Sequence, residues 1–191
     1  MAGDEADALR ARLEEYIGKP MGPPMAAPDP VNVPMIRHWV DALDDRNPVY
    51  LHEEFAATTR FGGVVAPPAM LQTWTFPRPR IEGIAERGGA PGDMNPDHPI
   101  PMLDAAGYVG TLATNSEFEF VRYLRPGDHV HTASELESIS NRKTTSLGKG
   151  YFVTWVTHYM DADDEIVGRQ LFRIFKFDPS TIDLSTLGAT S

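Results

Sequence analysis

Residues 45–70 read Asp-Arg-Asn-Pro-Val-Tyr-Leu-His-Glu-Glu-Phe-Ala-Ala-Thr-Thr-Arg-Phe-Gly-Gly-Val-Val-Ala-Pro-Pro-Ala-Met, and this stretch decides the fold. A turn at 45–48 leads into an acidic helix start, and a second turn follows at Gly62 and Gly63. From residue 64 to 74 the chain is apolar enough for a largely buried helix. Pro67 and Pro68 would lie in its first turn, where a missing N–H group costs least.

Apolar residues at helical spacing predict two further helices before this stretch. The first covers residues 4–17, with Gly18 placed to end it. Residues 19–34, called the strap below, hold six prolines, which remove so many N–H donors that only extended or turn structure is expected. The second helix covers residues 33–42 and leads into the turn at 45–48.

The second half of the chain predicts a sheet. Residues 76–109 contain too many Pro and Gly residues for regular structure, and such a segment inside a compact domain is usually functional or mobile. Strand-like runs follow at 111–123, 129–140, 149–160 and 166–177, with turns at 125–128 and 161–164. One buried helix followed by long antiparallel strands predicts an α+β domain over 33–178. Residues 1–32 form an N-terminal extension in this division, and residues 179–191 a tail or linker.

Composition narrows the classes of function. A chain of 191 residues with 41% hydrophobic content can bury one core, and its net charge of −10 argues against a nucleic-acid partner. No cysteine is present, which excludes disulfides and thiolate metal sites and fits a cytoplasmic location. No signal peptide or membrane-spanning stretch is expected. His129 and His131 share one face of a predicted strand without a third ligand nearby, and His98 is isolated, so we expect no metal site.

Two landmarks resemble the MaoC-like hot-dog hydratases and dehydratases. The family pattern Asp-x-Asn-Pro-x-His is matched by Asp45, Asn47 and Pro48, and its aromatic-Gly-Gly turn and following small residue by Phe61, Gly62, Gly63 and Ala66. The second landmark is Phe120-Val121-Arg122-Tyr123-Leu124-Arg125-Pro126-Gly127-Asp128. The resemblance covers residues 33–177 and implies a hot-dog fold, in which an antiparallel sheet wraps a long central helix.

Two departures fall where the family performs its chemistry. Tyr50 stands in place of the catalytic His, and Pro67 and Pro68 replace the usual His-Gly. A phenol has a pKa near 10, so only about one part in a thousand would be the basic form at neutral pH. In the family the Gly N–H polarises the thioester carbonyl, and Pro68 has no N–H to donate. The site at Asp45, Asn47, Tyr50 and Pro68 is therefore interpreted as degenerate, and His52 is the remaining candidate base.

The resemblance therefore implies a non-catalytic subunit of a heteromeric 2-enoyl-CoA hydratase, most similar to the MaoC-like subunits of actinobacterial steroid degradation. In this hypothesis the chain shapes a tunnel for a bulky steroid side-chain acyl-CoA, while a hot-dog partner in a heterodimer or heterotetramer supplies Asp and His. Candidate substrate-binding residues are Gly62, Gly63, Ala66, Arg78 and Arg80, the arginines reaching toward a coenzyme A phosphate. The thioester is the substrate, and no cofactor is expected. A thiolase-like aldolase could bind through an extension beyond Pro179.

Two other functions stay open at this point. Asp45 and His52 could serve a stand-alone enoyl-CoA hydratase or 3-hydroxyacyl dehydratase, or the chain could bind an acyl-CoA or a partner enzyme without turnover. Each candidate residue also has a purely structural interpretation. Asp45 fits an Asx turn, His52 the exposed start of a helix, and Tyr50 a packing residue that fills the space of the missing His.

Overall fold

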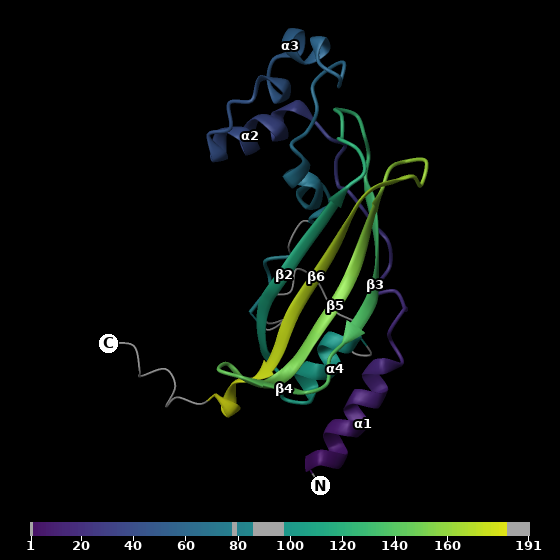
Figure 1. The fold of residues 1–191 in the computed structure, drawn as a ribbon, viewed down its shortest axis with the longest axis vertical. Coiled ribbons are helices and arrows are strands. Elements are labelled where there is room, and N and C mark those ends of the chain that lie inside the picture. Colours follow the sequence, from purple (N-terminus) through teal and green to yellow (C-terminus); the bar gives the residue numbers. More distant parts are fainter. Residues whose placement is uncertain (1, 78–79, 86–97, 183–191) are drawn as a thin grey trace, which may run out of the picture.

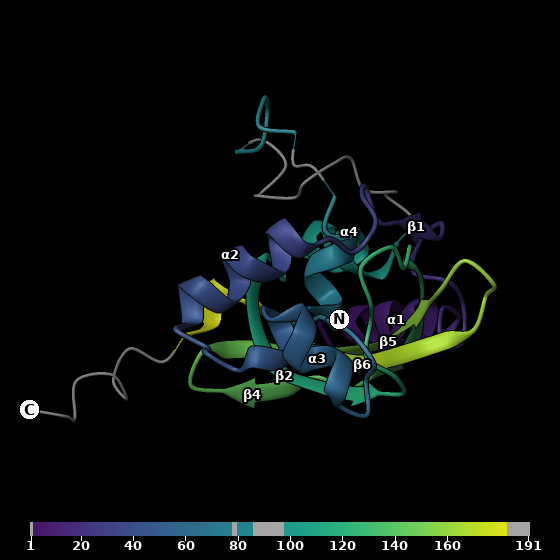
Figure 2. The ribbon, with the colours of Figure 1, turned by 90° about the horizontal axis from the view of Figure 1, so that it is seen from above.

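The computed structural model describes residues 2–77, 80–85 and 98–182, and it contains one antiparallel sheet with helices on one side (Figures 1 and 2). The strand order is β1-β3-β5-β6-β2, and β4 pairs with β5 beside β3. The strands are β1 (Met25–Ala26), β2 (Gly110–Phe120), β3 (His131–Ile139), β4 (Lys143–Thr145), β5 (Gly148–Met160) and β6 (Ile166–Asp178). The four long strands confirm the predicted runs, whereas β1 and β4 were not predicted.

Two core clusters cover the helix-bearing face of the sheet. At one end, α2 (Val33–Leu43), the short α3 (Glu53–Thr58) and the loop around Val65 pack against Tyr159 and Val167. At the other end, α1 (Ala2–Glu14) and α4 (Pro99–Ala105) pack against Tyr151, Val153 and Ile174. Figure 1 shows these helix pairs at opposite ends of the long strands. The prediction of an N-terminal helix and of a helix leading into the first turn is confirmed.

The predicted central helix over 64–74 is wrong in extent and type. Residues 64–67 are not helical, and a 3₁₀ helix, η2 (Pro68–Thr75), follows them. Pro67 and Pro68 are compatible with either helix type, whereas the threonines and tryptophan after Gln72 are poor α-helix formers. Phe76 is extended and Pro77 follows it, which ends the segment. The long central helix implied by the hot-dog resemblance is therefore reduced to eight residues.

The second core cluster needs a helix that the sequence did not predict. Residues 76–109 were expected to be irregular, but Pro99–Ala105 forms α4 within them. Pro99 occupies the first helical position, and the His98 side chain caps the helix by accepting a hydrogen bond from the N–H of Ile100 at 3.3 Å. Met102 and Leu103 are buried against the sheet. Tertiary packing therefore overrides the unfavourable composition of this segment.

An ion pair between a buried lysine and a partly exposed aspartate fixes α4 to the sheet. The Lys176 Nζ atom lies 2.5 Å from Asp104 Oδ1 and donates to Thr111 Oγ1 at 2.8 Å, and the Lys176 side chain is only 3% exposed. A charge removed from water to this extent needs a partner. Asp104 is therefore the residue that allows Lys176 to lie under the helix.

We expect Asp104→Asn to lower the free energy of unfolding by about 1–3 kcal/mol, because it leaves a buried ammonium without its counter-charge. Glu119→Gln is the matched control. Glu119 pairs with Arg169 at 3.6 Å on the surface, and such a pair should contribute less than about 1 kcal/mol. Urea unfolding of both variants measures the difference. Equal losses in the two variants would show that Lys176 does not depend on Asp104.

Candidate functional site

The first turn of the site is held by its own polar side chains. Asp45 Oδ1 accepts a hydrogen bond from the N–H of Asn47 at 3.0 Å, which is an Asx turn. Asn47 Oδ1 in turn accepts from the N–H of Val49 at 3.2 Å and caps the 3₁₀ helix η1 (Pro48–Tyr50). Both side chains therefore shape the loop, and these contacts account for the Asp-x-Asn-Pro pattern without any catalytic role.

Tyr50 belongs to the core. It is 8% exposed and lies in the cluster that contains Ile36 and Val40 of α2. Burial raises the pKa of its phenol, and the neighbouring Tyr123 and Asp45 raise it further. Since this pKa already starts near 10, the phenol is protonated at neutral pH. At the position of the family's base, this chain holds a buried packing residue.

His52 lies on the surface at the start of α3. It occupies the N-cap position, its side chain makes no capping hydrogen bond, and it is exposed to solvent. The Asp45 carboxylate, half-buried in its Asx turn, is used by the loop itself. The geometry gives no contact that would join Asp45 and His52 into an acid–base pair among the described residues.

Residues 66–68, which follow the glycine turn, have no free N–H group to offer a thioester. Gly62 adopts a φ of 67°, a left-handed conformation that favours glycine, and Gly63 is buried behind it. The Ala66 N–H donates to the carbonyl of Leu124 at 2.8 Å, and Pro67 and Pro68 have no N–H. The hollow beside these prolines has a volume of about 10 Å³, room for one water molecule at most.

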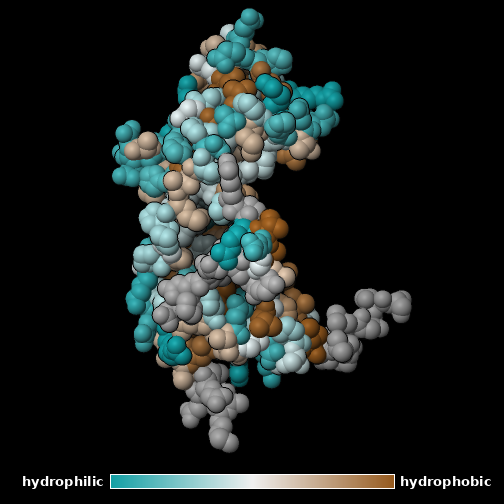
Figure 3. All heavy atoms as spheres, turned by 180° about the vertical axis from the view of Figure 1, so that it is seen from behind, coloured by the Kyte–Doolittle hydropathy of each residue, from teal (hydrophilic) through white to brown (hydrophobic). Residues whose placement is uncertain are grey.

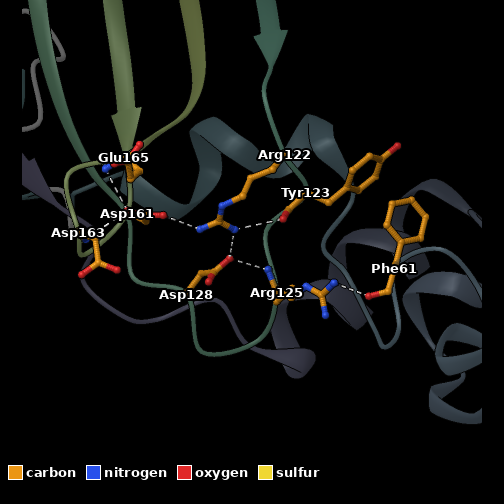
Figure 4. A network of polar contacts seen from close by, with 8 residues as sticks. All are labelled: Phe61, Arg122, Tyr123, Arg125, Asp128, Asp161, Asp163 and Glu165. Carbon is orange, nitrogen blue, oxygen red and sulfur yellow. Dashed lines mark hydrogen bonds and ion pairs between the residues drawn. The ribbon is translucent and has the colours of Figure 1, made fainter.

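An arginine network holds the second landmark in place (Figure 4). Arg122 donates to Asp128 Oδ2 at 2.6 Å and to Asp161 Oδ2 at 2.8 Å, so it joins the 125–128 turn to the β5–β6 hairpin. Asp161 Oδ1 accepts from the N–H groups of Asp163 and Glu165 at 3.1 Å. Both predicted turns are confirmed, and one guanidinium connects them.

The second landmark, residues 120–128, also holds the glycine turn of the first landmark in place. Arg125 donates a hydrogen bond to the carbonyl of Phe61, and the rings of Phe61 and Tyr123 lie 4.6 Å apart between centroids (Figure 4). The two sequence landmarks therefore meet in space through these contacts and through the Ala66–Leu124 hydrogen bond. The loop architecture of the site is intact, although a buried Tyr50 stands where the family has its base.

A large cavity lies on the helix-bearing face of the sheet and has a volume of about 670 Å³. Its walls come from the strap, from the start of α4 and from the inward side chains of β2, β3, β5 and β6. They include Tyr16, Met21, Ile100, Trp155 and Ile174. This volume lies within the range of about 300–1,000 Å³ typical of small-molecule sites. The sequence did not predict the cavity, because residues far apart in the chain form it.

The remaining candidate residues, two arginines for substrate binding and two histidines considered as metal ligands, lie elsewhere in the chain. Arg78 lies outside the described residues, and Arg80 is exposed in the 80–85 segment. His129 Nε2 lies 2.8 Å from the carbonyl oxygen of Ala27, and His131 pairs with Asp164 at 3.0 Å. Among the described ranges, no group of three or more potential metal ligands occurs, and no helix is long and apolar enough to cross a membrane.

A family model described as the FAS1-like, dehydratase domain region matches residues 17–170. The chain belongs to this family. A probable enoyl-CoA hydratase alpha subunit from Thermomonospora curvata is 41% identical over 187 residues, which is 94% of this chain and 54% of that protein. The 3-oxo-4,17-pregnadiene-20-carboxyl-CoA hydratase alpha subunit from Mycobacterium tuberculosis is 42% identical over 166 residues, 85% of this chain and 50% of that protein.

A solved structure in the same family has the same fold. A chain of the ChsH1–ChsH2 complex from Mycobacterium tuberculosis superposes with a TM-score of 0.75 at 36% identity, covering 92% of this chain and 93% of that chain. The predicted MaoC-like hot-dog resemblance is confirmed by these matches. The chain spans about half the length of the two curated relatives.

The arginine network predicts a pH dependence of stability. The hydrogen bond from Arg122 is the largest cause that holds the pKa of Asp161 below its usual range. A lowered folded-state pKa stabilises the protein above the unfolded pKa, and this contribution is lost as the pH falls through the folded value. We therefore expect the unsubstituted protein to lose more stability than Arg122→Met between about pH 6 and about pH 3.

Urea unfolding at the two pH values measures this difference. Arg46→Met is the matched control, because Arg46 pairs with Asp44 at 2.9 Å with both side chains almost fully in solvent. It should keep the acid sensitivity of the unsubstituted chain. If Arg122→Met also keeps it, the network does not hold Asp161 in its ionised form.

Proposed function

We propose that this chain is a subunit of a heteromeric 2-enoyl-CoA hydratase, in which it shapes the acyl site while a second hot-dog subunit supplies the reactive groups. The names of the relatives support this proposal, since both curated proteins are hydratase alpha subunits. The observation that carries it is the burial of Tyr50 in the core at the position of the family's base.

The chemistry explains why this chain would need a partner. Hydration of a 2-enoyl thioester needs a base for the attacking water, an acid for the alpha carbon and a donor to the carbonyl oxygen as enolate charge develops. Tyr50 is protonated at neutral pH, and the backbone from Ala66 to Pro68 has no free N–H. The base and the oxyanion donor would therefore come from the other subunit.

The open edge of the sheet is a suitable surface for that subunit. Among the described residues β2 pairs only with β6, and apart from Gly110 and Asn115 its own residues are exposed. Leu112, Phe118 and Phe120 are 45%, 37% and 42% exposed, although they are large and hydrophobic. In Figure 3, hydrophobic side chains reach the surface on the side of the molecule where β2 lies. A long, uncovered edge strand with apolar side chains is a surface that proteins normally pair.

The cavity supports a bulky acyl group as the substrate. The short η2 leaves part of the sheet face to the strap and α4, and the space of about 670 Å³ lies there. Its walls are mostly apolar, which suits a fused ring system better than a charged ligand. One relative carries a pregnadiene-carboxyl-CoA substrate in its name. We therefore propose a polycyclic, steroid-like acyl-CoA as the substrate, with no cofactor beyond the thioester itself.

Two details of the hypothesis stay predictions. A thiolase-like aldolase partner beyond Pro179 and a cytoplasmic location follow from the resemblance and from composition alone. A stand-alone hydratase using Asp45 and His52 is less well supported, because the first side chain is used by its loop and the second lies in solvent. A binding function without turnover would keep the cavity and lose the need for a catalytic partner.

The isolated chain should hydrate an enoyl-CoA substrate at no more than the background rate, and addition of the catalytic hot-dog subunit should restore turnover. Phe118→Asp should prevent this restoration, because it places a charge on the open edge where the partner would bury it. Ile166→Asp is the matched control, since Ile166 is 44% exposed at the β5–β6 hairpin. Spectroscopic loss of the enoyl thioester measures the rate, and native mass measures the assembly.

Turnover by the isolated chain, abolished by His52→Ala, would replace this proposal with the stand-alone enzyme. An assembly that forms but never turns over, with the partner's own Asp and His intact, would favour the binding function instead.

A further inference from the structure

The large cavity contains few polar groups, and most of them are already used. His98 accepts from the Ile100 N–H at Nδ1 and also hydrogen-bonds the Met21 backbone, so it joins α4 to the strap. The Thr132 hydroxyl donates to the carbonyl of Met25 at 3.4 Å. Thr111 accepts from Lys176 and is itself exposed to water. None of these three side chains needs a ligand to satisfy its hydrogen-bonding groups.

A pair of hydroxyls on neighbouring strands keeps a hydrogen that it does not use. Ser134 of β3 lies opposite Thr157 of β5, and their oxygens are 2.8 Å apart. Ser134 lines the cavity, whereas Thr157 is 8% exposed behind it. Neither hydroxyl makes another hydrogen bond among the described residues. The pair has two hydroxyl hydrogens and uses only one of them in its mutual bond.

The position of the unused hydrogen follows from burial. If Ser134 donates to Thr157, the Thr157 hydrogen is left in the strand layer without an acceptor, which is costly for a buried group. If Thr157 donates to Ser134, both Thr157 and the Ser134 acceptor are satisfied, and the Ser134 hydrogen can turn into the cavity. The second arrangement is favoured, and it places one hydrogen-bond donor in a mostly apolar space.

We propose that the Ser134 hydroxyl, oriented by Thr157, donates a hydrogen bond to an oxygen atom on the ring system of the acyl group. The pair therefore selects polycyclic ketones over hydrocarbons of the same shape. This inference rests on the proposed function only in taking the cavity as the acyl site. Ser134 is a specificity-determining residue. Thr157 is a positioning residue, because its hydrogen bond fixes the direction of the Ser134 O–H bond. Neither takes part in the addition of water.

Binding can be measured without turnover, because Trp155 lines the cavity and its fluorescence reports occupancy. The probes are androstanone, a tetracyclic ketone, and androstane, the hydrocarbon with the same rings, titrated into the full chain. Trp155→Phe identifies the signal that comes from Trp39 and Trp74. We expect the ketone to bind roughly tenfold more tightly than the hydrocarbon, the effect of one net hydrogen bond.

Substitutions then separate the hydroxyl from the shape of the cavity. Ser134→Ala should remove the preference for the ketone and leave the affinity for androstane unchanged. Thr157→Val should reduce the preference, and Thr157→Ser, which keeps the hydroxyl, should retain it. Melting temperatures of the variants establish that each one is folded.

Equal affinities for the two probes in the unsubstituted chain, or a preference that survives Ser134→Ala, would overturn the inference. So would the absence of any Trp155 response to both probes, since the cavity would then not be a ligand site. A ketone preference in a chain that never supports hydration would leave the inference standing and would refute the proposed function alone.

Discussion

The backbone of Ala66, Pro67 and Pro68 is the constraint on which the rest of the structure depends. Its one N–H group is bonded to the Leu124 carbonyl, and the two prolines have none. The segment therefore cannot stabilise an enolate, and the helix that follows it is a 3₁₀ helix of eight residues. Because this helix is short, the strap, α1 and α4 cover the other end of the sheet, and a cavity of about 670 Å³ lies there.

Close packing and hydrogen bonds nevertheless hold the backbone around the site in place. The Leu71 side chain of η2 packs so closely on β6 that a Cβ on Gly168 would lie 2.5 Å from it. Arg122 joins two turns through two carboxylates, and Arg125 reaches the carbonyl of Phe61. These contacts hold the loop of the site in its shape while its interior contains Tyr50. The loop of the site is kept, while Tyr50 fills the position of the family's base and the Asp45 carboxylate is used by its own Asx turn.

Sequence patterns predicted the strands and turns that are determined by residues within the same segment. The four long strands have extended β-branched and aromatic runs, and the 125–128 and 161–164 turns have their own Gly and Asp residues. The character of η2 was missed because Pro67 and Pro68 are compatible with an α-helical first turn, and the low helix propensity of Thr73, Trp74 and Thr75 is a weak signal. The helix α4 was missed because it depends on Lys176, which is 72 residues away from Asp104. The cavity and the Ser134–Thr157 pair depend on strand register, which the sequence does not reveal.

The central claim is that this chain contributes shape and its partner contributes reactivity. The most direct test is the single-turnover rate of enoyl-CoA hydration by the assembled heteromer when this chain carries Asp45→Asn, Tyr50→Phe and His52→Gln together. All three side chains lose their acid–base capacity, while their shapes are nearly kept. We expect a rate constant within about twofold of the unsubstituted assembly. A loss of roughly a hundredfold or more, the size of a general acid–base contribution, would show that reactive groups of this chain take part and would contradict the account.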